Sequence, residues 1–333
     1  MSRPLPALAL AATVGLVALA GCGSGTATKD DGKRAAEPAT SPALTTTPAG
    51  TTRKVAPLPQ GIAYDAKTGS LVVAVRDPYR LLVLNPDTLR VRRSVGLPGK
   101  VRHLQVTPQG GTVLVPSETA DKVFEVDLAT GQMRATDVQR HPHDAAGADD
   151  GDVLVGNEFS GSMSVVRRGR VVHTFTDLRQ PGGVLASGHL AVAVDVGDYT
   201  VTTYDLDTDK RVARVPAGKG PTHGVLVGAG RIAVTDTRGD RVLLYTLDPL
   251  KQVGSIALKG SPYGVAGDPT TSTAWVTLTG SNRLVGLDVS GDQPEVIASY
   301  PTVRQPDTVA VAPGAKTLWV TGTEDGVVQR ISR

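Results

Sequence analysis

The sequence predicts an all-β protein, a seven-bladed β-propeller with four-stranded antiparallel blades. Seven copies of one unit recur about every 40 residues, a period that is typical of propeller blades. The start of the first strand in each copy gives one set of positions: Gly61, His103, Asp144, Gly183, Gly224, Gly264 and Thr308. The end of the third strand gives a second set with similar spacing: Asn85, Asp127, Arg167, Asp205, Thr246, Asp288 and Ser332. Two independent sets of positions therefore indicate the same number of blades.

Each copy has the same internal order of strands. Its second strand is a short apolar run, such as SLVVAV at 70–75 or TLWVTG at 317–322. Short apolar runs bounded by turns are typical of strands that are buried on both faces. The third strand alternates apolar and polar residues, and a turn then leads to a more polar outer strand, as in KRVARVPA at 210–217.

The repeat array begins one strand early, and its last copy stops after a third strand. Residues 53–57 precede the first copy, whereas the seventh copy ends with residues 330–333. We expect the early strand to complete the seventh blade, because closing the ring in this way removes the open edges of the sheets. Residues 53–333 are therefore predicted to form one propeller domain.

The first 21 residues are predicted to be a lipoprotein signal peptide. Arg3 supplies a positive charge, and the apolar run from Leu5 to Ala20 is short for a membrane-spanning helix. The sequence Leu-Ala-Gly-Cys at 19–22 resembles the bacterial lipobox, which implies that Cys22 is lipidated. We therefore expect an exported, lipid-anchored protein on the outer face of the cytoplasmic membrane or on the cell surface. Cys22 is the only cysteine, so the exported domain should contain no disulfide.

Residues 22–52 are expected to be the lipidated cysteine followed by a disordered tether. This stretch is rich in Gly, Ser, Thr, Pro and Ala and shows no apolar period. Segments of this composition cannot bury enough apolar surface to offset the entropy of ordering.

The charge of the chain argues against nucleic acid as a partner. The formal net charge is +3, from 35 Lys and Arg against 32 Asp and Glu. The basic runs at 90–93 and 167–170 are short and far apart in the sequence, which is not the pattern of a phosphate-tracking surface. We expect a monomer whose partners are the membrane, through Cys22, and an unidentified small ligand or envelope protein.

Several blade motifs resemble the YVTN-repeat β-propeller family. The resemblance extends over about residues 54–333 and implies a propeller fold. The family includes exported and surface proteins, and relatives with binding or lactone-cleaving activity, so no active-site residue is carried over to this chain. The matching motifs are Pro59–Ala63, Pro262–Ala266, Ala274–Thr277 and Leu318–Thr321.

Equivalent positions of the blades should meet at one mouth of the central channel. The two positions that matter are the one just before the start of each first strand and the one at the end of each second strand, and on blades 2 to 5 they carry most of the ionisable and amide side chains. Glu118 and Glu158 directly follow the ends of two second strands. The predicted ligand-binding residues are Arg102, His103, His143, Asn157, Asp195, His223, Asp236 and Asp307.

The sequence predicts a binding module that presents this mouth to a small ligand, a metal ion or a protein partner. His143, His223, Asp195 and Asp236 offer nitrogen and oxygen donors for a divalent metal such as Zn²⁺ or Cu²⁺. His141 and His143 need not share one ion, because alternate residues of a strand point to opposite faces.

Three alternatives stay open at this stage. One is a metal-dependent lactonase-like hydrolase, another is a structural or assembly protein of the cell envelope, and the third is a mouth whose polar residues bond only to water. The chain has no G-x-S-x-G elbow, no Walker loop and no H-E-x-x-H motif. A catalytic site would therefore have to be assembled from separate blades.

Overall fold

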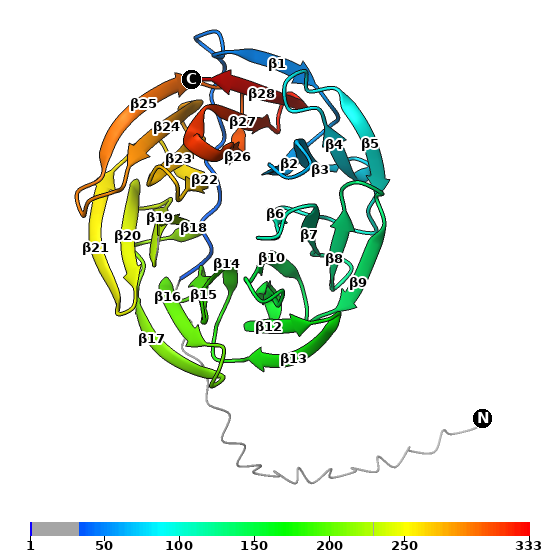
Figure 1. Ribbon diagram of the computed structural model, residues 1–333, viewed down its shortest axis with the longest axis vertical. Coiled ribbons are helices and arrows are strands. Elements are labelled where there is room, and N and C mark those ends of the chain that lie inside the picture. Colours follow the sequence, from blue (N-terminus) through cyan, green and yellow to red (C-terminus); the bar gives the residue numbers. More distant parts are fainter. Residues whose placement is uncertain (2–32, 229) are drawn as a thin grey trace. The chain divides into compact units, whose positions relative to one another are not determined.

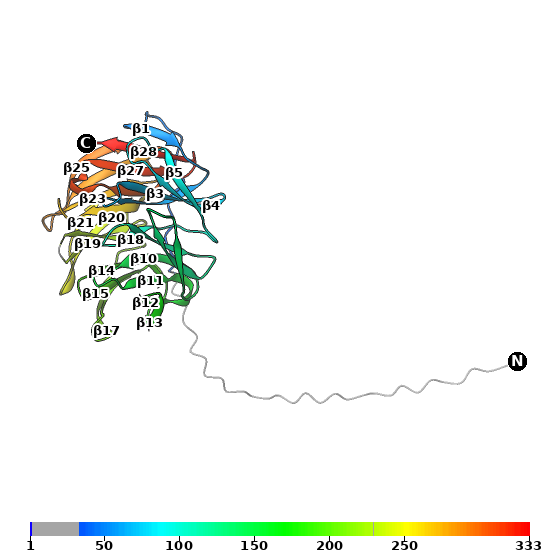
Figure 2. The same ribbon diagram turned by 45° about the vertical axis from the view of Figure 1, so that its right-hand side comes forward.

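The computed structural model describes Met1 and residues 33–228 and 230–333, and in these residues 28 strands form seven four-stranded antiparallel sheets. The sheets are arranged as blades around a central axis (Figure 1). Figure 2 shows the same blades after a turn of 45° about the vertical axis. The predicted seven-bladed propeller is therefore confirmed. The predicted signal peptide, Cys22 and the tether up to residue 32 lie outside the described residues.

The first four blades each place consecutive strands from the centre outward, and the strands are listed in that order. Blade 1 consists of β2 (Pro59–Asp65), β3 (Ser70–Arg76), β4 (Tyr79–Leu84) and β5 (Val91–Gly96). Blade 2 consists of β6 (Gln105–Val106), β7 (Thr112–Ser117), β8 (Lys122–Asp127) and β9 (Met133–Asp137). Blade 3 consists of β10 (Pro142–Gly147), β11 (Val153–Asn157), β12 (Ser162–Arg167) and β13 (Arg170–Phe175). Blade 4 consists of β14 (Pro181–Ser187), β15 (Leu190–Asp195), β16 (Thr200–Asp205) and β17 (Lys210–Pro216).

The last three blades follow the same order, except that the seventh takes its outer strand from the start of the domain. Blade 5 consists of β18 (Pro221–Gly228), β19 (Arg231–Asp236), β20 (Arg241–Leu247) and β21 (Leu250–Ala257). Blade 6 consists of β22 (Pro262–Asp268), β23 (Thr273–Leu278), β24 (Arg283–Asp288) and β25 (Glu295–Pro301). Blade 7 consists of β26 (Pro306–Val311), β27 (Thr317–Gly322), β28 (Val327–Ser332) and β1 (Thr51–Lys54). Two short 3₁₀ turns, η1 (Glu158–Ser160) and η2 (Pro313–Ala315), complete the described elements.

The core lies between the blades. The described residues contain seven clusters of buried apolar side chains, one at each boundary between neighbouring blades. The apolar second strands supply many of these side chains, and Trp275 and Trp319 on two of them are almost fully buried. Each blade therefore has two apolar faces, and each face packs in a different cluster. This agrees with the second strands, whose apolar residues point to both faces.

The closure of the ring is confirmed. β1 pairs antiparallel with β28, from Thr51 opposite Arg330 to Lys54 opposite Val327. The strand covers 51–54 and not the expected 53–57, because the chain must turn inward after Lys54 to reach β2. Leu58 takes a left-handed conformation with φ of 51° in this turn.

Residues 33–50, here called the strap, are not the disordered tether that the composition predicts. They form an irregular, extended segment that contacts blades 4 to 7, and Figure 1 shows this blue segment crossing the middle of the ring. The Tyr199 hydroxyl donates to the Arg34 carbonyl over 2.7 Å, and Ser41 Oγ donates to the Thr279 carbonyl over 2.6 Å. Composition fails here because the strap is ordered mainly by hydrogen bonds of its backbone and of Ser41, with little apolar burial of its own.

Among the described residues no helix is long and apolar enough to cross a membrane.

Candidate functional site

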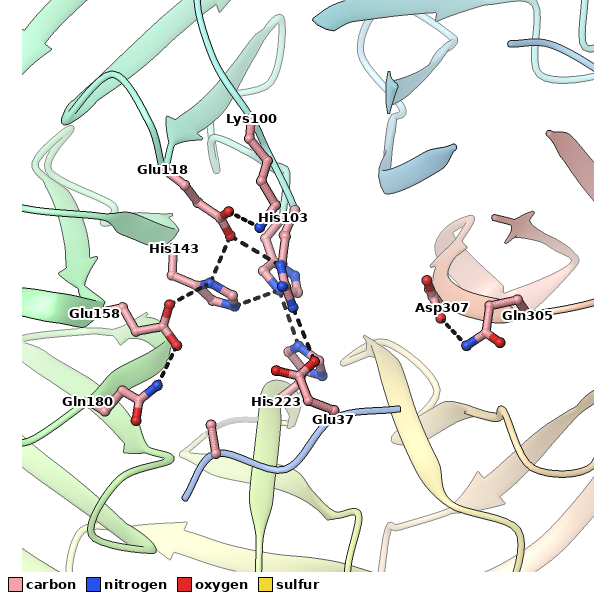
Figure 3. A network of polar contacts seen from close by, with 12 residues as sticks. Glu37, Lys100, His103, Glu118, His143, Glu158, Gln180, His223, Gln305 and Asp307 are labelled. Carbon is pink, nitrogen blue, oxygen red and sulfur yellow. Dashed lines mark hydrogen bonds and ion pairs between the residues drawn. The ribbon is translucent and has the colours of Figure 1, made fainter. Parts of the chain in front are cut away.

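Three histidines from three blades meet at the mouth beneath the strap. His103 Nε2 lies 3.1 Å from His143 Nε2 and 3.2 Å from His223 Nε2. Figure 3 shows the rings of His103, His143 and His223 converging. These residues, here called the histidine cluster, are far apart in the sequence, and the ring closure makes them neighbours. The mouth predicted from the repeat alignment therefore does bring His103, His143 and His223 together.

Local irregularities of the inner strands direct these side chains toward one point. β6 has only two residues, whereas the other inner strands have six to eight, so His103 precedes the strand in an irregular segment. His143 lies in β10 where the register shifts between Pro142 and Asp144, and His223 lies at a similar shift between Pro221 and Gly224 in β18. Such bulges redirect side chains that a regular strand would point elsewhere.

Partners on the far side of two rings fix their orientation. His223 Nδ1 lies 3.0 Å from the Tyr263 carbonyl oxygen, so Nδ1 carries the proton that it donates. His143 Nδ1 lies 3.1 Å from Glu118 Oε1 and 3.3 Å from Glu158 Oε2, so it also donates. In the neutral form of each ring, Nε2 then holds a lone pair that is aimed into the cluster.

Glu118 and Glu158, here called the carboxylate pair, are almost fully buried. Glu118 also pairs with Lys100 Nζ at 2.5 Å and with Arg102 Nε at 3.3 Å, and Gln180 Nε2 donates to Glu158 over 2.8 Å. Burial alone would raise the pKa of each carboxyl, but hydrogen bonds from His143 and Lys100 lower the pKa of Glu118 to about 2. Hydrogen bonds from His143 and Gln180 lower the pKa of Glu158 to about 2 as well. Both groups are therefore charged at neutral pH.

The protonation of the histidine cluster is unequal. Burial lowers the pKa of His223 to about 4, and burial with the neighbouring His223 and His143 lowers the pKa of His103 well below its ordinary value. Burial would also lower the pKa of His143, but its hydrogen bonds to the carboxylate pair raise it to about 9. Without a metal ion, one proton is thus held at His143 and the other two rings are neutral.

The spacing of the histidine cluster fits a metal ion. A tetrahedral Zn²⁺ with Zn–N bonds of about 2.0–2.1 Å holds its nitrogen ligands about 3.3–3.4 Å apart. The two measured separations, 3.1 and 3.2 Å, are close to this value, and all three ligand atoms lie within 4.8 Å of one another. The two separations from His103 therefore match a shared ion, so His103, His143 and His223 can hold one together.

Glu118, His141 and His143 form a second group of donors within 4.8 Å. In this group Glu118 is already paired with Lys100 and Arg102. Since two cations occupy the carboxylate, the group is better suited to orient His143 than to hold a second metal ion.

Of the four residues expected from the sequence to bind a metal, His143 and His223 lie in the histidine cluster, and Asp195 and Asp236 do not. Asp195 accepts hydrogen bonds from the backbone amides of Arg179, Gln180, Gly197 and Asp198, and Asp236 accepts from those of Lys219, Gly220 and Gly239. Both carboxylates are buried and satisfied within their own loops. Both hold turns, and neither belongs to the group of donor atoms that His103, His143 and His223 form.

The other expected mouth residues have mixed roles. Arg102 faces the cluster and pairs with Glu118, whereas Asn157 is fully buried and donates to Ser162 and Ser164 within blade 3. Asp307 accepts a hydrogen bond from Gln305 over 3.0 Å and lies apart from the histidines across the mouth (Figure 3).

His141 lies closer to His143 than strand alternation suggests. Its Nδ1 lies 3.0 Å from Glu158 Oε2, the same oxygen that His143 contacts. The reason is that His141 precedes β10 and has a left-handed backbone, with φ of 58°. The sequence also pointed to Glu118 and Glu158 as the residues after two strand ends, but it did not show that both reach His143.

The histidine cluster separates two cavities of very different size. A cavity of about 300 Å³, here called the central channel, is lined by inner-strand residues together with His103 and His223. On the other side lies a pocket of about 20 Å³, which is lined by Ala35, Ala36 and Glu37 of the strap and by His143 and His223. The strap thus covers one side of the cluster, and the channel lies on the other.

Solved structures with the same fold include enzymes and assembly components. Hydrazine synthase from Kuenenia stuttgartiensis aligns with a TM-score of 0.73 and 19% identity, over 88% of this chain and 99% of that chain. Virginiamycin B lyase from Staphylococcus aureus aligns with a TM-score of 0.72 and 12% identity, over 85% and 99%. A streptogramin B lyase gives 0.70 and 12%, over 84% and 96%. At these identities the likeness shows the propeller fold alone.

No family model and no curated protein matches the sequence. The resemblance to the YVTN-repeat family therefore stays a prediction, and the shared β-propeller fold is what the comparisons establish.

Proposed function

We propose that this protein is an exported, lipid-anchored binding module that holds one divalent metal ion, Zn²⁺ or Cu²⁺, at His103, His143 and His223. The observation that carries the proposal is the convergence of three Nε2 atoms, with separations of 3.1 and 3.2 Å. Imidazole nitrogen suits both ions, whereas Ca²⁺ and Mg²⁺ prefer oxygen ligands.

The surroundings of the cluster support the same ion. Neutral histidine ligands usually donate their second ring proton to a carboxylate or to a backbone carbonyl, which fixes the ring and raises its basicity. His143 meets the carboxylate pair in this way, and His223 meets the Tyr263 carbonyl.

Equilibrium dialysis of the full chain in detergent against Zn²⁺ tests the proposal. The parent protein should bind one ion per chain at the cluster, and His103→Ala should lose this binding. His189→Ala is the matched control, because His189 is an exposed histidine near Asp205 in the turn between β14 and β15. Its blade, blade 4, contributes no histidine to the cluster. Equal zinc binding by the parent protein and by His103→Ala would refute the proposal.

Attachment to the membrane is a separate part of the proposal. It rests on the lipobox-like sequence that ends at Cys22. The parent protein should be recovered with membranes and should incorporate a labelled fatty acid, and Cys22→Ser should lose the label. A Cys22→Ser protein that is labelled like the parent would contradict lipidation at this residue. In this account the chain acts as a monomer and binds no nucleic acid.

A metal-dependent hydrolase or lyase is the second candidate. One observation favours it: three protein ligands leave a fourth position on the ion for water or substrate, as in catalytic zinc sites. Two proteins with the same fold are named as lyases. A panel of lactones and esters, assayed before and after removal of the metal, separates the two candidates. Turnover that disappears with the metal and returns with Zn²⁺ would favour the enzyme.

A further inference from the structure

We infer that the ion at the histidine cluster keeps its fourth coordination position toward the central channel, and that this position takes a small monoanion with an oxygen donor, such as a carboxylate. The anion enters from the mouth on the side away from the strap. This inference rests on the proposed metal site and adds the class of ligand and its route.

The fourth position has no His, Cys, Asp or Glu ligand among the described residues. The groups of donor atoms close enough to share an ion contain three residues each, and one of these groups is the histidine cluster itself. Asp195 and Asp236 are used by backbone amides, and the carboxylate pair contacts the opposite, Nδ1 side of His143. A four-coordinate ion must therefore take its last ligand from outside the chain.

The sizes of the two cavities decide where that ligand lies. The pocket beneath the strap has a volume of about 20 Å³, which is room for about one water molecule. The central channel has about 300 Å³ and is lined by His103 and His223, and this volume is at the lower end for small-molecule sites. A ligand larger than water can therefore reach the ion only from the channel side.

A second cavity shows the route to the channel. It has a volume of about 590 Å³ and shares Gln105, Val106, Val225 and Gly267 with the lining of the channel. Its other lining residues include Pro108 and Ser187, which lie at the ends of inner strands or in the loops that follow them. No strap residue lines either cavity. The two cavities thus form one path from the far mouth to the histidines.

The balance of charge selects an anion. The carboxylate pair is matched by Lys100 and Arg102, which contact Glu118. Among the residues that line the central channel, Asp144 alone carries a carboxylate, and its two oxygens accept from the amides of Ala145 and Val184. A divalent ion held by three neutral imidazoles would add two positive charges, of which the Asp144 carboxylate offsets one, so one uncompensated positive charge would remain in the channel. Because a buried net charge is costly, one monoanion completes the site.

Cobalt(II) replaces zinc in such sites and reports its own coordination by visible absorption, so the full chain loaded with Co²⁺ provides the test. Acetate should change the cobalt spectrum with saturation, and acetamide, which has nearly the same shape without the charge, should leave it unchanged at the same concentration. Val106→Phe and Val225→Phe, which add bulk at the junction of the two cavities on β6 and β18, should each slow the change of the cobalt spectrum after acetate is mixed in by at least tenfold, as measured by stopped-flow absorption.

Each outcome decides a stated part of the inference. A cobalt spectrum that changes with acetate and not with acetamide supports the anion, and a slower change in either valine variant supports the route. A cobalt spectrum that does not change with acetate, or that changes equally with acetamide, overturns the inference and leaves the metal site standing. A change as fast as that of the parent protein in both valine variants overturns the route. If the parent chain takes up no cobalt, the proposed function itself fails.

Discussion

Blades 2 and 3 use the ends of their second strands differently from blades 4 and 5. In blades 4 and 5 the acid is the last strand residue, Asp195 or Asp236, and its oxygens accept hydrogen bonds from backbone amides of the loops around it. In blades 2 and 3 the acid comes one position later, as Glu118 or Glu158, and contacts His143.

This one-residue difference separates acids that hold the fold from acids that serve the site. Glu118 and Glu158 come after the last strand residue, and Glu158 already lies in η1, so a shift of one position takes the carboxylate out of the strand and into the mouth. The longer side chain of glutamate then spans the remaining distance to the histidine. Polar residues at equivalent positions of a repeat therefore need not have equivalent roles.

The largest effect is expected from removing a fold-holding acid. Asp195→Ala would leave four backbone amides without their acceptor in a fully buried position. We expect the free energy of unfolding to fall by roughly 3 kcal/mol or more, measured by urea denaturation of the metal-free protein. Asp127→Ala, which removes an exposed turn acid that accepts from Thr130, should cost much less. Equal losses of unfolding free energy in the two variants would show that Asp195 stabilises the fold no more than an exposed turn acid does.

Removing a site-serving acid should change metal binding more than stability. Glu118→Gln keeps the shape of the side chain but weakens its hold on His143 Nδ1, so we expect zinc affinity to fall by about 10–100-fold. Competition with a fluorescent zinc chelator measures this change. Glu125→Gln is the matched control, because Glu125 pairs with Arg134 on the outer part of the same blade. Unchanged zinc affinity in Glu118→Gln would show that the carboxylate pair does not support the cluster.

The proton at His143 makes zinc binding depend on pH. Hydrogen bonds to the carboxylate pair raise the pKa of His143 to about 9, whereas burial lowers the pKa of His223 to about 4. Between these values one proton must leave before the ion binds, so zinc affinity should fall about tenfold for each unit of decreasing pH. Above pH 9 the dependence should disappear. Isothermal titration in buffers of different ionisation enthalpy counts the protons that zinc binding releases. A count near zero at neutral pH would show that His143 does not hold a proton in the metal-free protein.

The smallest effect is expected from the acid of the strap. Glu37 lies 3.6 Å from Arg102 but is largely exposed, with 68% of its side-chain surface accessible. Exposed ion pairs contribute little because water and salt screen them. Glu37→Gln should therefore change the free energy of unfolding by less than about 0.5 kcal/mol and leave zinc affinity nearly unchanged. A loss of zinc affinity as large as that of Glu118→Gln would make Glu37 part of the site.

The fold could be predicted from the sequence because the repeat determines it. The repeat spacing indicated the number of blades, as seen at Gly61, Gly224, Gly264 and their counterparts. The early strand before Pro59 indicated how the ring closes. The strap could not be predicted in the same way. Its composition resembles that of a linker, and its order depends on partners such as Tyr199 and Gln305 that lie far along the chain.

The candidate site was predicted in part, for a related reason. Repeat alignment correctly placed His103, His143 and His223 at one mouth. It could not show that Asp195 and Asp236 turn back to their loops, or that the short β6 frees His103 to reach the centre. These features depend on the local backbone of loops and on the length of one strand, which a pattern of residue types does not contain.

X-ray absorption at the zinc edge of the metal-loaded full chain tests the central claim most directly. The account predicts three imidazole ligands at about 2.0–2.1 Å with a fourth light-atom ligand, and the loss of this signature in His223→Ala. Two imidazoles together with carboxylate oxygens would place the ion at Glu118, His141 and His143 instead, and would contradict the account.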